Sequence, residues 1–208
     1  MMNEARHQDT GRLALALGVV AIGSAACLAT YSVMQGPFGT INDIGNAATG
    51  VLSATLAWRL RRQIAGRPAN VTVGAALVGA GIAVAGSALV VSGTTGWFLA
   101  GLVSSVGFAG IGAWLVVLNR SDAGGAVLPR RLRLLGIAAG ALMTVGVVAL
   151  PGIVLGLDDP AAAPAWVWIA FVGWFGTFVV YPAWAIWLAS VETRLDRQAT
   201  AVPNATGA

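Results

Sequence analysis

Apolar residues occur along this chain in six long runs, separated by short polar segments. A transmembrane α-helix needs about 20 consecutive, mostly apolar residues to cross about 30 Å of hydrocarbon. The pattern therefore predicts an all-α fold, a polytopic integral membrane bundle of six transmembrane helices in residues 12–189, between an N-terminal tail (1–11) and a C-terminal tail (190–208). The six predicted spans are residues 12–34, 40–58, 71–92, 97–118, 134–156 and 166–189.

Composition agrees with a membrane-embedded chain. Hydrophobic residues make up 57% of the 208 residues and charged residues only 10%, whereas soluble domains carry about 25% charge. There is no lysine, which excludes Schiff-base chemistry of the retinal-pigment kind. The absence of lysine beside abundant Ala, Gly, Val and Arg is typical of a GC-rich bacterium, so we expect the lipid bilayer of a bacterial inner (plasma) membrane to surround the chain.

The basic residues fix the predicted orientation. All twelve are arginines, and they lie before or at the start of the first span, in the loops after the second and fourth spans, and in the C-terminal tail. By the positive-inside rule, both termini are predicted to be cytoplasmic. The net charge of +4 is thereby explained by topology, and no nucleic-acid partner is expected. The arginines are Arg6, Arg12, Arg59, Arg61, Arg62, Arg67, Arg120, Arg130, Arg131, Arg133, Arg194 and Arg197.

The second span carries a regular polar stripe. Asn42, Asn46, Thr49 and Ser53 follow a spacing of i, i+4, i+7, i+11, which places them within about 40° of one another on an α-helix. Such a stripe should face protein or water, because lipid offers polar groups no partners. Asp43 lies at the outer end of the stripe.

Asp43 is the only ionisable residue well inside a predicted span, which by itself suggests a functional site. Two interpretations are open. The segment from Thr40 to Asp43 has the spacing of a capping box, in which the carboxylate would stabilise the helix N-terminus. Alternatively, Asp43 belongs with Asn42, Asn46, Thr49 and Ser53 to a polar binding or permeation site.

The sixth span is rich in aromatic residues. Trp174, Phe178 and Tyr181 share one face of the predicted helix, which could form the wall of a pocket for a flat or isoprenoid molecule or could simply face lipid and neighbouring helices. Pro182 cannot donate the usual helical hydrogen bond and should kink this span, as Pro151 should kink the fifth.

Signatures of an enzyme or a metal site are sparse. His7, the only histidine, lies in the N-terminal tail, and Cys27 has no second cysteine to pair with. Asp158 and Asp159 fall in the segment "DDPAAAPA", which indicates a solvated turn more than a carboxylate pair. The sequence therefore predicts no metal and no cofactor.

Glycine is concentrated in spans three to five. Small residues let membrane helices approach closely, so these three helices are predicted to form the tightly packed centre, and the GxxxG motif in span five could equally serve a homo-oligomer. The glycines are Gly74, Gly79, Gly81, Gly86, Gly101, Gly107, Gly110, Gly112, Gly136 and Gly140.

Three hypotheses of function follow. The first is a non-enzymatic inner-membrane protein, such as a small transporter or binding subunit, whose polar stripe lines an outward-facing cavity for a hydrophobic small molecule or lipid. The second is a membrane-embedded isomerase or terpene-cyclase-like enzyme that uses Asp43 as its acid and aromatic rings to stabilise a carbocation. The third is a structural or regulatory membrane subunit without a ligand site.

Overall fold

The protein is described by a computed structural model that covers residues 2–61, 64, 67–121 and 128–201, and these residues form helices and no strand. Six long helical stretches follow one another, joined by short turns. The elements are α1 (Met2–Met34), α2 (Phe38–Leu60), α3 (Arg67–Val91), α4 (Trp97–Arg120), α6 (Arg130–Thr144), the 3₁₀ helix η2 (Val145–Ala149), α7 (Leu150–Val154), the 3₁₀ helices η3 (Pro160–Ala162) and η4 (Ala165–Ala170), α8 (Phe171–Phe175), the π-helix η5 (Gly176–Val180) and α9 (Tyr181–Ala201).

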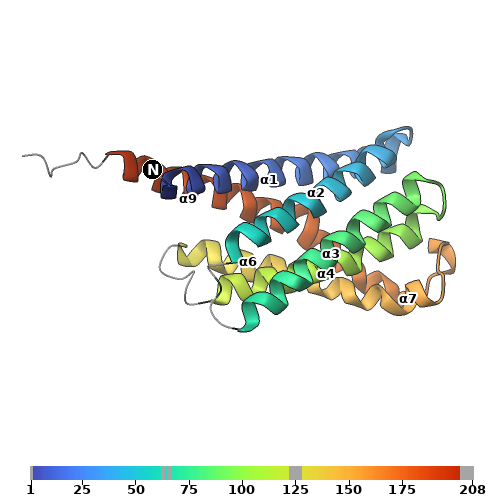
Figure 1. Ribbon diagram of the computed structural model, residues 1–208. Coiled ribbons are helices and arrows are strands. Elements are labelled where there is room, and N and C mark those ends of the chain that lie inside the picture. Colours follow the sequence, from blue (N-terminus) through green and yellow to red (C-terminus); the bar gives the residue numbers. More distant parts are fainter. Residues whose placement is uncertain (1, 62–63, 65–66, 122–127, 202–208) are drawn as a thin grey trace, which may run out of the picture.

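The helices form a bundle in which sequence neighbours run in opposite directions. α1 packs against both α2 and α9, while α3 packs against α4 and α4 against α6. Figure 1 shows α1, α2 and α9 along one side of the bundle and α3, α4, α6 and α7 along the other. The first and last helices, α1 and α9, are thus side by side. The two sides of the bundle meet where α2 packs against α3, the next helix in the sequence.

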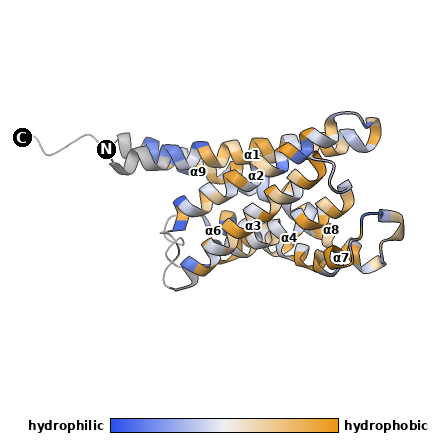
Figure 2. Cartoon of the chain, turned by 45° about the vertical axis from the view of Figure 1, so that its right-hand side comes forward, coloured by the Kyte–Doolittle hydropathy of each residue, from blue (hydrophilic) through white to orange (hydrophobic). Residues whose placement is uncertain are grey.

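Five segments of the described chain are long and apolar enough to cross a membrane, and the middle of the bundle is mainly hydrophobic along its length (Figure 2). α2 has sufficient length but is not among the five, because its polar residues lower the hydropathy of the helix. The chain is therefore an all-helical protein with several membrane-capable helices, and the count of six spans stays a prediction. The five segments are Gln8–Met34, Asn70–Val91, Trp97–Arg120, Arg130–Val154 and Ala165–Arg197.

The start of α1, the end of α9, and the arginine-bearing ends of α2, α3, α4 and α6 lie at one end of the bundle (Figure 1). α1 already begins at Met2 and α9 continues to Ala201, so much of both predicted tails is helical. The two helices remain in contact there, where the Gln8 side-chain amide donates a 2.8 Å hydrogen bond to Asp196. Arg59 pairs with Asp9 at 3.2 Å at the same end.

Glycines bring α3, α4 and α6 into close contact, as predicted for spans three to five, although Gly74 and Gly81 of α3 meet nothing within 4 Å. A methyl group added to Gly107 would lie 2.5 Å from the Gly79 carbonyl oxygen, and one added to Gly140 would lie 2.5 Å from the Gly112 carbonyl oxygen. Backbone atoms occupy those positions, so no larger residue fits without moving the helices apart.

The fifth and sixth predicted spans depart from α-helical geometry near their prolines, as expected. Pro151 lies at the start of α7, directly after the 3₁₀ helix η2. Pro182 follows the π-helix η5, where the Tyr181 N–H group donates to the carbonyl oxygen of Gly176, five residues back. Since Pro182 has no N–H group for the α-helical ladder, the chain takes the wider π turn at this point.

Candidate functional site

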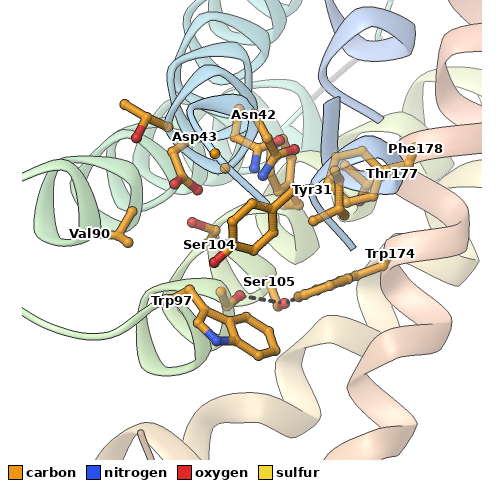
Figure 3. Close-up of a pocket in the computed structure, with 17 residues that line it drawn as sticks. Tyr31, Asn42, Asp43, Val90, Trp97, Ser104, Ser105, Trp174, Thr177 and Phe178 are labelled. Carbon is orange, nitrogen blue, oxygen red and sulfur yellow. Dashed lines mark hydrogen bonds between the residues drawn. The ribbon is translucent and has the colours of Figure 1, made fainter. Parts of the chain in front are cut away.

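A cavity of about 230 Å³ opens at the arginine-free end of the bundle. Side chains from α1, α2, α3, α4, α8 and η5 surround it, and several polar groups converge on it among aromatic rings (Figure 3). The lining residues are Leu28, Tyr31, Gly36, Gly39, Thr40, Asn42, Asp43, Asn46, Val90, Trp97, Gly101, Ser104, Ser105, Phe108, Trp174, Thr177 and Phe178.

One hydroxyl group of α1 orients the two asparagines of α2. The Ser24 hydroxyl group lies 2.9 Å from the Asn42 side-chain oxygen and 3.1 Å from that of Asn46, and all three side chains are buried. Gly45 permits this close approach, because a methyl group there would lie 2.8 Å from the Ser24 Cβ atom.

The predicted capping box does not form. α2 begins at Phe38 with Pro37 as its N-cap residue, and no side chain caps this helix end. Thr40 is therefore the third residue of the helix and not its N-cap residue, so Thr40 and Asp43 do not occupy the positions of a capping box. Asp43 is half-buried and faces the cavity instead.

The polar stripe divides into two parts. Asn42, Asp43 and Asn46 line the cavity, whereas Thr49 and Ser53 lie deeper and are fully buried in helix packing. Thr49 donates to the Gly45 carbonyl oxygen at 2.8 Å and Ser53 to that of Thr49 at 2.6 Å. Their hydroxyl groups are thus satisfied within α2, as is common for Ser and Thr in helices.

The aromatic face of the sixth predicted span divides in the same way. Trp174 and Phe178 line the cavity, while Tyr181 is buried below it. The Trp174 indole N–H group donates to the Ser105 hydroxyl oxygen at 2.8 Å (Figure 3). Its ring packs 4.1 Å from the Phe171 ring centroid and meets the Phe178 ring edge-on at 6.1 Å, so these contacts fix the aromatic wall.

Several lining residues were missed by reasoning from the sequence. Ser104 and Ser105 form a polar pair inside an apolar run, which is a signal that could have drawn attention to α4. Ser24 carries the same weak signal in α1. Tyr31 and Trp97 give none, because aromatic residues near span ends are expected at any membrane interface.

The segment before the aromatic span is exposed, as predicted, and also has a structural role. The Asp158 carboxylate accepts hydrogen bonds from the backbone N–H groups of Gly96, at 2.6 Å, and Leu99, at 3.1 Å. Asp158 therefore caps the N-terminus of α4, which carries Ser104 and Ser105 into the cavity. Asp159 caps the short helix η3 through the Ala161 N–H group.

The fold and the cavity define a class, an all-helical protein with membrane-capable helices and a polar cavity at one end. Comparison of the chain with protein-family models, with curated proteins and with solved structures finds no match. Within the part of the chain that the structure describes, no group of three or more His, Cys, Asp or Glu side chains could hold a metal ion.

Proposed function

We propose that this protein is a non-enzymatic multi-pass inner-membrane protein with six spans and cytoplasmic termini, and that its outward-facing cavity binds a small, partly apolar molecule. A small transporter or a binding subunit would have this design. The observation that carries the proposal is the joining of Asn42, Asp43 and Asn46 with Trp174 and Phe178 around one cavity.

The chemistry of the lining supports a binding site. Ligand pockets are typically apolar and aromatic with a few well-placed polar groups, and this cavity combines several rings with two amides and one carboxylate. A cavity of about 150 Å³ holds one benzene ring. At about 230 Å³, this one suits a single ring with a few further atoms.

The arrangement also brings Asp43 into the same cavity as the aromatic rings, which favours the isomerase or cyclase hypothesis as a second candidate. Such a reaction needs a donor that starts the carbocation and a group that removes a proton at the end. Among the described lining residues, Asp43 is the only carboxylic acid and there is no histidine, so binding without chemistry is the better-supported proposal.

Equilibrium dialysis of the protein in lipid nanodiscs, with empty nanodiscs as the blank, tests the proposal. The probes are single-ring compounds of different charge: tert-butylbenzene, phenyltrimethylammonium and benzoate. Val90 lines the cavity and Val91, the next residue of α3, does not. We expect saturable binding of at least one probe that Val90→Trp abolishes and Val91→Trp preserves. If Val90→Trp leaves binding of all three probes unchanged, the proposal fails.

A further inference from the structure

The charged residues at the cavity end of the bundle are acidic. Asp43 is the only acidic residue among the described lining residues, and none of them is basic. In the sequence, the loops predicted at this end contain Asp158 and Asp159 but no Arg, Lys or His. Because the arginine-bearing ends of α2, α3, α4 and α6 lie at the opposite end (Figure 1), the electrostatic potential at the cavity favours a positively charged ligand.

Asp43 is the carboxylate that a ligand could reach. Asp158 already accepts two hydrogen bonds from the start of α4, and Asp159 caps η3. The Ser24 hydroxyl group donates to the side-chain oxygen of Asn42, and the Asp43 carboxylate follows on the next residue of α2. It is directed into the space beside Ser104 and Val90 (Figure 3).

Aromatic rings from separate elements surround the same space. Tyr31 comes from α1, Trp97 from α4, Trp174 from α8 and Phe178 from η5, and Figure 3 shows the rings of Tyr31, Trp97 and Trp174 close to one another below Asp43. The face of an aromatic ring attracts an organic cation, with the strongest effect for tryptophan. A carboxylate together with several such rings is the set of groups that binds an ammonium ligand.

We infer that the ligand is a small organic monocation, either an amine or a quaternary ammonium compound, and this inference rests on the proposed function. The apolar part of the ligand packs on the rings while Asp43 balances its charge. Hard metal cations are disfavoured because Ca²⁺ takes six to eight oxygen ligands, and the described lining offers one carboxylate. An anion would meet the Asp43 charge with no basic side chain among the described lining residues.

The dialysis probes separate charge from shape, because phenyltrimethylammonium and tert-butylbenzene differ by the exchange of N⁺ for carbon. We expect the cation to bind about tenfold or more tightly than its uncharged isostere, and benzoate to bind most weakly. Asp43→Asn should remove this preference, whereas Asp43→Glu should retain it. Asp159→Asn, which removes a carboxylate at the same end but outside the lining, should leave it unchanged.

A second set of variants tests the rings. Tyr31→Phe keeps the ring and should keep the preference for the cation, whereas Tyr31→Leu and Phe178→Leu should each reduce it by about twofold to fivefold. Equal binding of both isosteres, with no effect of Asp43→Asn, overturns the inference but leaves a binding cavity intact. Failure of Val90→Trp to affect any probe overturns the proposed function itself.

Discussion

The Tyr181 hydroxyl group donates a hydrogen bond to the Ser53 hydroxyl oxygen at 2.9 Å, which joins α9 to α2 across 128 positions of sequence. Both side chains are fully buried. The Tyr181 ring also stacks on Trp184, with ring centroids 5.8 Å apart. Because this contact lies directly below the cavity, it fixes α2, which supplies Asn46 to the lining, against the start of α9, which directly follows the π-helix η5 that supplies Phe178.

Tyr181→Phe should lower the free energy of unfolding by about 0.6 kcal/mol and by no more than about 1.7 kcal/mol, the average and the maximum measured for hydrogen bonds between membrane helices. The ring and its stacking on Trp184 are kept, so the loss reports the hydrogen bond. Unfolding in detergent micelles titrated with dodecyl sulfate is the measurement. Ser53→Ala and the double variant complete a thermodynamic cycle, and a coupling energy near zero would show that the two hydroxyl groups do not stabilise one another.

Asp158→Ala should destabilise the protein by about 1 kcal/mol, because the N–H groups of Gly96 and Leu99 lose their side-chain cap. Gly96→Ala should have a similar effect, since its methyl group would lie 2.6 Å from the Asp158 Oδ1 atom. Thermal unfolding and hydrogen exchange at the start of α4 measure the change. Asp159→Ala is the matched control and should cost less, because Asp159 caps only the three-residue helix η3.

Glycine-to-alanine substitutions should have opposite signs at two positions. Gly107→Ala places a methyl group 2.5 Å from the Ala83 backbone nitrogen and the Gly79 oxygen, which forces α3 and α4 apart and should destabilise the protein by more than about 1 kcal/mol. Gly81→Ala meets nothing within 4 Å and should stabilise α3 by about 0.5–1 kcal/mol.

Thermal unfolding of the two variants in the same detergent compares these signs directly. If Gly107→Ala were as stable as Gly81→Ala, the close approach of α3 and α4 would be wrong. This comparison needs no knowledge of the ligand, so it tests the bundle independently of the cavity.

The helical fold could be predicted from hydropathy because the length of an apolar run directly reflects the thickness of a bilayer. The breaks near Pro151 and Pro182 could also be predicted, since a missing N–H group interrupts any helix. The start of α2 could not be predicted in this way. The segment "TIND" has the spacing of a capping box, which would start the helix near Thr40, whereas the helix begins at Phe38, directly after the preceding turn.

The candidate site could be predicted only in part. Helical spacing placed Asn42 and Asn46 on one face. The spacing within one helix, however, does not show which part of that face is covered by a neighbouring helix and which part lines a cavity. That boundary depends on Ser24 meeting the two asparagines, and on Tyr181 meeting Ser53 below them. These are contacts between distant segments, so a single sequence leaves the depth of the cavity undetermined.

Cysteine labelling should test the six-span topology. Thr94 lies in the turn between α3 and α4 and Ala161 lies in η3, and both are exposed at the arginine-free end. In a Cys27→Ala background, we expect a membrane-impermeant maleimide to label Thr94→Cys and Ala161→Cys in intact cells. Ser190 is exposed and lies near the arginine-rich end, so Ser190→Cys should be labelled only after the membrane is permeabilised.

If α2 did not cross the membrane, Thr94 would be on the cytoplasmic side of a chain whose N-terminus is cytoplasmic. Protection of Thr94→Cys in intact cells, with labelling after permeabilisation, would therefore contradict both the six-span count and the outward-facing cavity.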